Sequence, residues 1–174
     1  MCHGFGMIRS IAISAFAAAV LAPCLVRADD RPTSAIEQQI ADATNSSRVT
    51  VVHFWAPWCL NCKAELANGG WSGFIAGNPD VDFVFVTIWN PVDGRDLLEK
   101  FGVGAEKNFQ LLLHPNASRK RGEKVAELLG IPISWIPTTW VFKDGKLRYA
   151  MNYGELRFPM LQQLVRDSTD AWDH

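Results

Sequence analysis

Two cysteines three positions apart, Cys59 and Cys62, are the residues of this sequence best suited to carry chemistry. An apolar run before them predicts a buried strand, Val49–Phe54, and the residues after them are typical of a helix start. Side chains three apart on a helix share one face, so the two sulfurs can close a disulfide or reopen as thiols with little movement. The helix dipole and free N–H groups would favour an exposed thiolate at Cys59, with Cys62 one turn deeper. The spacing therefore indicates thiol–disulfide exchange, with a structural disulfide or half of a metal site as alternatives.

The N-terminal segment has the features of a secretory signal peptide. Arg9 precedes a short apolar run, Ile11 to Leu21, and Val26-Arg27-Ala28 is typical of a signal peptidase site. We predict cleavage after Ala28, which divides the chain into a signal peptide, 1–28, and one domain, 29–174. An uncleaved N-terminal membrane anchor is the alternative.

Cleavage changes the cysteine count. The sequence has four cysteines, and Cys2 and Cys24 would leave with the signal peptide. A secreted domain whose only cysteines are Cys59 and Cys62 has no disulfide framework, so its one possible bridge is this close pair.

Composition sets broad limits on fold and partners. A chain of 174 residues, 48% hydrophobic and 20% charged, suits one globular domain with a real core. The formal net charge of -1 gives no argument for nucleic acid as a partner.

The elements that would position the cysteines alternate between helix and strand. A capping box at Ser34–Glu37 begins a helix, and Asp144-Gly145 predicts a tight hairpin. Gly69-Gly70 predicts a break in the helix that follows the cysteines. The remaining expected elements are strands Val49–Trp55, Val81–Trp89 and Gln110–Leu113, a helix Asn116–Leu129 closed by Gly130, hairpin strands Thr138–Phe142 and Leu147–Asn152, and a helix from Phe158.

Two motifs resemble the thioredoxin superfamily. The stretch from Phe54 to Lys63, FWAPWCLNCK, looks like its active site, and Ile136-Pro137-Thr138 before the hairpin resembles its cis-proline loop. An extra segment before that loop makes the chain similar to the periplasmic TlpA/ResA/CcmG (DsbE) branch. The resemblance covers Ser34 to Asp167. It implies an α/β fold, a thioredoxin-like mixed sheet flanked by helices, with an insertion between the second core strand and the cis-proline loop.

The resemblance also assigns roles. Cys59 would be the nucleophile that attacks a partner's disulfide, and Cys62 the resolving thiol. Trp58, Ile136 and Pro137 would contact the substrate, with Pro137 in the cis form.

Three further features carry more than one interpretation. His53 stands where many thioredoxins have a buried aspartate, so it is either a proton acceptor for Cys62 or a neutral core histidine. Trp135 either lines a partner groove or packs within the inserted loop, and the second is favoured. The basic run Arg119-Lys120-Arg121 is expected on a solvent-facing helical turn rather than at a partner.

The expected function is a periplasmic thiol–disulfide oxidoreductase that reduces disulfides in partner proteins, such as cytochrome c maturation or copper-site assembly factors. A membrane thiol reductant such as a DsbD/CcdA-like carrier would re-reduce it. We expect a monomer with no cofactor beyond the redox-active disulfide Cys59–Cys62, no nucleic-acid partner, and membrane contact only through an uncleaved signal segment. The alternatives are a disulfide-forming oxidase or isomerase, and a Cu(I)-binding chaperone module that uses Cys59, Cys62 and His53.

Overall fold

The chain divides into two units, Met1–Arg31 and Pro32–His174. The fold described below is that of the second unit. The structure is a computed structural model that describes residues 34–151 and 156–169, so the predicted signal peptide, 1–28, lies outside the described residues. The elements in chain order are α1 (Ala35–Thr44), β1 (Val49–Trp55), α2 (Leu60–Leu66), a 3-10 turn η1 (Ala67–Gly69), α3 (Gly70–Ala76), β2 (Val81–Thr87), α4 (Arg95–Lys100), β3 (Phe109–Leu113), β4 (Glu127–Leu128), β5 (Ile131–Pro132), β6 (Thr138–Lys143), β7 (Lys146–Met151) and α5 (Phe158–Thr169).

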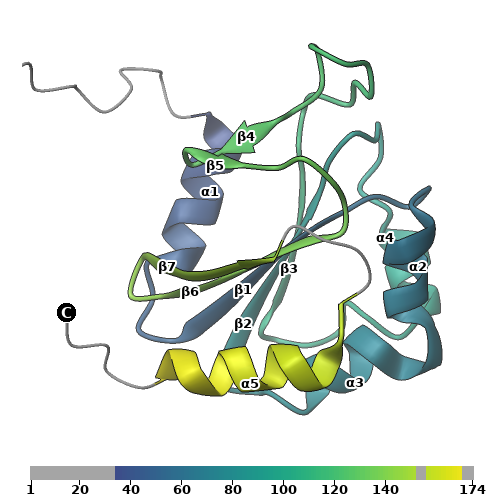
Figure 1. The fold of residues 1–174 in the computed structure, drawn as a ribbon. Coiled ribbons are helices and arrows are strands. Elements are labelled where there is room, and N and C mark those ends of the chain that lie inside the picture. The colour runs from purple at the N-terminus through teal and green to yellow at the C-terminus, as the bar shows by residue number, and fades with distance from the viewer. Residues whose placement is uncertain (1–33, 152–155, 170–174) are drawn as a thin grey trace, which may run out of the picture. The chain divides into compact units, whose positions relative to one another are not determined.

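A five-stranded mixed sheet forms the centre of this unit, with strand order β3-β2-β1-β6-β7 (Figure 1). β1 runs parallel to β2 and antiparallel to β6, and its last paired residues are Phe54 with Thr138 and Trp55 with Thr87. Because antiparallel strands run in opposite directions, the end of β1 lies beside the start of β6. The loop after β1 carries the cysteines and the loop before β6 carries Pro137, so the pairing brings the two predicted motifs to one edge of the sheet.

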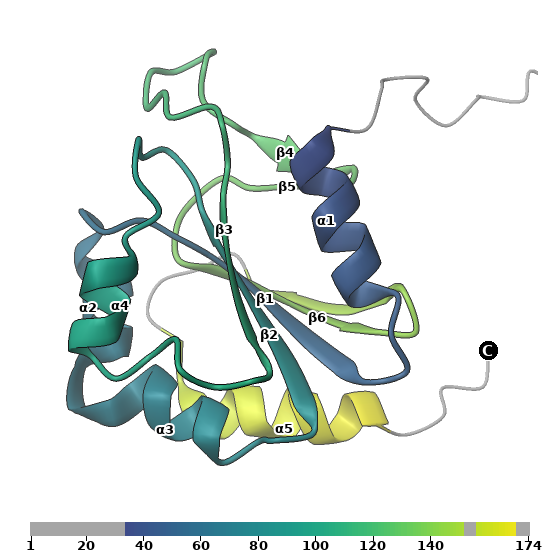
Figure 2. The ribbon, with the colours of Figure 1, turned by 180° about the vertical axis from the view of Figure 1, so that it is seen from behind.

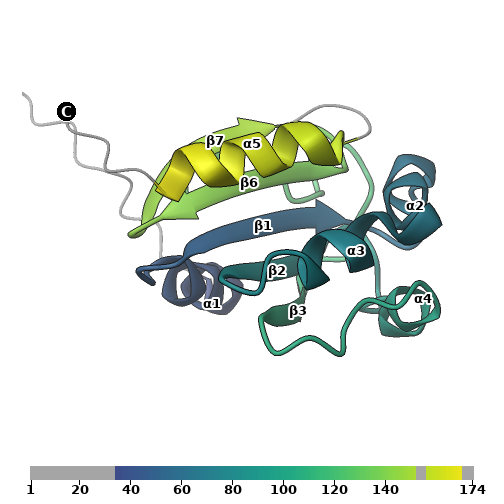
Figure 3. The ribbon, with the colours of Figure 1, turned by 90° about the horizontal axis from the view of Figure 1, so that it is seen from below.

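Helices cover both faces of the sheet, as predicted. α3 and α5 lie together on one face, and α1 lies on the other (Figures 1 and 3). Side chains alternate along β1, so Val51 and Trp55 join the core under α3 and α5 while Val52 and Phe54 join the core under α1. His53 shares the side of Val51 and Trp55, which places it under the helices that follow the cysteines.

The predicted break after the cysteine helix is confirmed. Asn68 and Gly69 adopt left-handed φ values of 54° and 74°, which end α2 and redirect the chain into α3. The turn carries Trp71 into the core, where its side chain is fully buried.

The predicted helix Asn116–Leu129 is wrong. The segment is a long loop followed by the short hairpin β4–β5, next to the N-terminal end of α1 (Figure 2). Leu129 and Gly130 both have positive φ, so Gly130 belongs to a hairpin turn and not to a helix C-cap. Tertiary contacts hold the extended form: Glu37 Oε1 accepts the Leu129 N–H at 3.0 Å, and the Val125 carbonyl accepts the indole N–H of Trp89 at 2.8 Å.

Candidate active site

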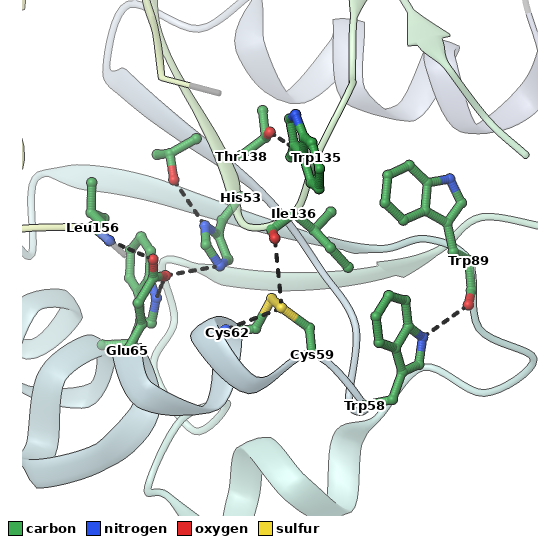
Figure 4. Close-up of a disulfide and its surroundings, with 12 residues drawn as sticks. His53, Trp58, Cys59, Cys62, Glu65, Trp89, Trp135, Ile136, Thr138 and Leu156 are labelled. Atoms are coloured by element: carbon green, nitrogen blue, oxygen red, sulfur yellow. Dashed lines mark hydrogen bonds and ion pairs between the residues drawn. A yellow bond between two sulfur atoms is a disulfide. The ribbon is translucent and has the colours of Figure 1, made fainter. Parts of the chain in front are cut away.

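The two cysteines form a disulfide at the start of α2, with their Cα atoms 5.2 Å apart (Figure 4). Cys59 is the N-cap of the helix, and the Cys62 N–H donates to its sulfur at 3.2 Å. Such a donor stabilises negative charge on a thiolate. Cys59 was expected to be exposed, but only 6% of it is, against 1% of Cys62. Cys59 is therefore the sulfur nearer to solvent, although the surface around it covers most of the side chain.

The loop before β6 closes over the disulfide. The Ile136–Pro137 peptide bond is cis, Pro137 is buried, and the Ile136 carbonyl oxygen lies 3.7 Å from Cys59 Sγ. The Thr138 hydroxyl donates to the Trp135 carbonyl at 2.8 Å and ties the two ends of the loop together. The backbone at Ile136 is thus held next to the more exposed sulfur.

His53 lies fully buried beneath the site, between β1 and α2 (Figure 4). Its Nδ1 is 2.9 Å from the Thr139 hydroxyl, and its Nε2 is 3.4 Å from Glu65 Oε2. The ring also packs against Trp71, with centroids 4.5 Å apart. Burial lowers the pKa of His53 to about 3, so the imidazole is neutral near pH 7. These contacts favour the neutral core histidine of the two interpretations.

Glu65 is a buried acid that our reading of the sequence missed. It accepts the indole N–H of Trp71 at 3.1 Å and the Leu156 N–H at 2.7 Å, in addition to its contact with His53. A buried acid needs such partners, because burial of a polar group without hydrogen bonds costs free energy. Its position three residues after Cys62 was a usable signal, because that spacing puts an acid on the same helix face as the resolving cysteine.

The outer side of the site is built from tryptophans. Trp58 is 36% exposed and donates its indole N–H to the Trp89 carbonyl at 3.1 Å. Trp89 is itself buried and holds the inserted loop through Val125. Trp135 is 68% exposed, so the favoured interpretation of it as a packing residue is wrong. Trp58 and Trp89 thus connect the cysteine loop to the segment between β3 and β6.

The basic run is exposed, as predicted, but one of its members contacts the site. The Arg119 guanidinium lies over the Trp58 ring, 3.8 Å from the ring centroid. Lys124 takes a similar position over Trp89, with its ammonium 4.1 Å from the ring centroid. Cations over aromatic faces are attracted to the ring quadrupole. The inserted loop therefore brings positive charge to the edge of the site, which the sequence interpretation did not anticipate.

Proteins of known function that are similar to this chain in sequence or fold include thiol–disulfide oxidoreductases. No protein-family model matches the sequence. Sporulation thiol-disulfide oxidoreductase A of Bacillus subtilis is 28% identical over 105 residues, which cover 58% of this chain and 59% of that protein. The chain thus spans less than two thirds of the length of this curated relative.

Solved structures show the same fold at lower identity. A secreted Mycobacterium tuberculosis disulfide oxidoreductase homologous to E. coli DsbE superposes with a TM-score of 0.51 at 22% identity, over 72% of this chain and 85% of the other. A DsbF homologue from Corynebacterium diphtheriae gives a TM-score of 0.54 at 18% identity, over 72% of this chain and 74% of the other. These likenesses show that the chain has a thioredoxin-like fold. Its mixed five-stranded sheet flanked by helices is the thioredoxin-like fold that the sequence motifs predicted.

In this thioredoxin-like domain the described residues assemble no group of three or more His, Cys, Asp or Glu side chains that could hold a metal ion. His53 directs its two ring nitrogens to Thr139 and Glu65, and not to the cysteines. The ligand set of the copper alternative is therefore not assembled in this geometry. Within the same part of the chain, no helix has the length and apolar character needed to cross a bilayer.

Proposed function

We propose that this thioredoxin-like protein is a thiol–disulfide oxidoreductase that reduces disulfides in partner proteins. One observation carries the proposal: Cys59 and Cys62 form a disulfide on the first turn of α2, with the Ile136 carbonyl 3.7 Å from the more exposed sulfur. This arrangement leaves one sulfur able to receive a partner and one sulfur behind it able to resolve the complex.

The reaction proceeds in two exchanges. In the reduced protein the Cys59 thiolate attacks one sulfur of the partner's disulfide, forms a mixed disulfide and releases the partner's other sulfur as a thiolate. The Cys62 thiol then loses its proton, and its thiolate attacks Cys59 Sγ, which restores the Cys59–Cys62 disulfide and releases the partner's second sulfur as a thiolate. Two electrons pass from the protein to the partner, and the two released thiolates take up protons equal in number to those that Cys59 and Cys62 gave to solvent. The Cys62 N–H, which donates to Cys59 Sγ, stabilises that sulfur whenever it carries negative charge.

Trp58, Ile136 and Pro137 supply the contact surface for the partner in this proposal. An extended partner segment would pair with the backbone at Ile136, as in the addition of a strand to an open edge. Its cysteine would then lie beside Cys59. Trp58, which is partly exposed next to Cys59, would cover the apolar side of that segment.

The cellular location of the protein and the direction of electron transfer in this proposal rest on the resemblance to the TlpA/ResA/CcmG branch. A cleaved signal peptide, 1–28, would place a monomeric domain in the periplasm. There it would act on cytochrome c maturation or copper-site assembly proteins, with the disulfide as its only redox group. A membrane dithiol carrier of the DsbD/CcdA class would return the two electrons after each turnover.

A pair of cysteine variants tests the exchange. The reduced wild-type protein should reduce a disulfide-containing protein such as insulin, and Cys59→Ser should bring the rate down to the uncatalysed background. Cys62→Ser should accumulate mixed disulfides on Cys59 in cells, which mass spectrometry of the trapped complexes would identify. Normal protein levels with no trapped partner would contradict the proposal.

The direction of electron flow needs its own measurement. The Cys59–Cys62 couple should equilibrate with glutathione at a reducing midpoint, closer to that of thioredoxin than to that of a strong oxidase. A strongly oxidising midpoint would instead support the disulfide-forming alternative.

A further inference from the structure

An open groove lies between the cysteine loop and the inserted segment, lined by tryptophans and by three cations, Arg119, Arg121 and Lys124, that we call its rim. Its volume is about 950 Å³, and it shares Trp58 and Ile136 with the site described above. The other residues that shape its character are Trp89, Trp135, Arg119, Arg121 and Lys124.

The charge of the groove has one sign. Three of the described residues that line it are cationic and none is acidic. The net charge of the whole chain, -1, is slightly negative, so this concentration of positive charge is local. A cleft lined by one sign of charge raises the local concentration of oppositely charged partners.

Two of the cations are already ordered by the tryptophans. Arg119 lies over Trp58 and Lys124 over Trp89, and the Lys124 ammonium is 3.5 Å from the Ser134 carbonyl. Trp58 is in turn hydrogen-bonded to the Trp89 carbonyl. A charged group that is held in place before binding loses less conformational entropy when a partner arrives. Tryptophan and arginine are also the residue types that most often dominate binding energy at protein interfaces.

We propose that this groove receives acidic side chains that flank the target cysteine of a partner protein, so that the inserted segment selects acidic disulfide-bearing substrates. The inference rests on the proposed function, because the groove begins at the residues that would hold the substrate strand. A strand paired at Ile136 presents its flanking side chains to Trp58 and Trp135, and carboxylates there reach the guanidinium and ammonium groups on the rim. Bidentate pairing with Arg119 or Arg121 would give the contact its specificity.

A binding experiment tests the groove without thiol chemistry. Short peptides carry a central serine in place of cysteine, flanked on each side by two Glu, two Gln or two Lys, and their binding to the oxidised protein is followed by tryptophan fluorescence. We expect the Glu peptide to bind about tenfold more tightly than the Gln peptide. The difference in affinity between the Glu and Gln peptides should become smaller as salt is added up to about 0.15 M, where the Debye length has fallen to about 8 Å.

Variants of the rim locate the effect. The triple variant Arg119→Gln/Arg121→Gln/Lys124→Gln should bind the Glu and Gln peptides equally, and Arg119→Glu/Lys124→Glu should prefer the Lys peptide. Lys146→Gln is the matched control, because Lys146 is exposed and pairs with Lys143 at the opposite end of β6 from Pro137. Equal binding of the Glu and Gln peptides by the wild type, or a preference that survives in the triple variant, would overturn the inference. A single-stranded oligothymidylate that binds more tightly than the Glu peptide would also overturn it.

An exchange experiment separates this inference from the proposed function. Each peptide, now with cysteine, is supplied as its disulfide-linked dimer to the reduced protein, and each turnover should yield one Cys59–Cys62 disulfide and two peptide thiols. We expect the Glu dimer to be reduced about tenfold faster than the Gln dimer. Equal rates would overturn the acidic preference and uphold the reductase. Tight binding of the Glu peptide with no reduction of either dimer would overturn the reductase and uphold the groove.

Discussion

The two sides of the disulfide are built in opposite ways. Beneath it, Glu65 accepts N–H groups from Trp71 and Leu156 and touches His53, and all of these side chains are buried. Above it, Arg119 and Lys124 lie over tryptophans at the edge of an open groove. The inner contacts are enclosed and mutually paired, whereas the outer cations keep a side open to solvent. The difference indicates that the inner side holds the cysteine helix in place and the outer side meets the partner.

Removal of Glu65 should have the largest effect on folding. Glu65→Ala leaves the Trp71 and Leu156 N–H groups without this acceptor in the core, so we expect the free energy of unfolding to fall by about 3–5 kcal/mol. Denaturant unfolding of the oxidised protein measures it. Glu99→Ala on the exposed side of α4 is the control, with an expected change within about 0.5 kcal/mol. A loss below about 1 kcal/mol for Glu65→Ala would contradict a supporting role for the inner side.

Acid should lower the free energy of unfolding, because His53 on the buried side of the disulfide takes up a proton when the chain unfolds. The pKa of His53 is about 3 in the folded protein and has its ordinary value of 6.5 in the unfolded chain, so between these values the unfolded chain binds more protons than the folded chain. Stability from this group is fully present above about pH 6.5 and is lost as the pH falls toward 3, by up to about 1.4 kcal/mol for each pH unit. Urea unfolding between pH 6 and pH 4 should give a steeper slope for the wild type than for His53→Asn. Parallel slopes would mean that His53 does not titrate differently in the folded protein.

Matched tryptophan variants compare the two sides directly. Trp71→Phe keeps an aromatic ring and removes one N–H donor to the Glu65 carboxylate, so we expect a loss of about 1.5–3 kcal/mol in unfolding free energy. Trp58→Phe removes the N–H donor to the Trp89 carbonyl at a partly exposed site, where water replaces it, and the expected loss is about 0.5 kcal/mol. Thermal unfolding of both variants supplies the test. A larger loss for Trp58→Phe would reverse the assignment of the two sides.

The outer cations should contribute least to folding. Arg119→Gln and Lys124→Gln remove contacts at the protein surface, and each should change the free energy of unfolding by no more than about 0.5 kcal/mol. Unfolding curves at low and high salt check this. A loss above about 2 kcal/mol for either variant would mean that the outer side supports the fold as the inner side does.

Local patterns predicted much of the fold. The Ser34–Glu37 capping box begins α1, and the apolar run Val49–Trp55 is β1 with the predicted bounds. The Asp144-Gly145 turn joins β6 and β7. Each of these signals depends on neighbouring residues, such as a side chain that caps its own helix or a turn that matches strand twist.

The inserted segment was not predictable in the same way. Val125 and Leu128 are buried, as an inward helix face would require, but their backbone is extended. The groups that hold this form, Glu37 at the Leu129 N–H and Trp89 at the Val125 carbonyl, are distant in the sequence. Apolar spacing reports which side chains are buried and not which partners satisfy the backbone.

The parts of the candidate site can be recognised along the chain: two cysteines at helix spacing, a proline loop before a hairpin, and a strand long enough to position them. These depend on residue type and short spacing. What surrounds the disulfide depends on the folded structure. The neutral state of His53 comes from burial, the partners of Glu65 come from Trp71 and Leu156, and the cationic groove comes from a loop folded back onto Trp58 and Trp89. Burial and long-range contacts arise when distant segments pack together, so no single stretch of the chain contains them.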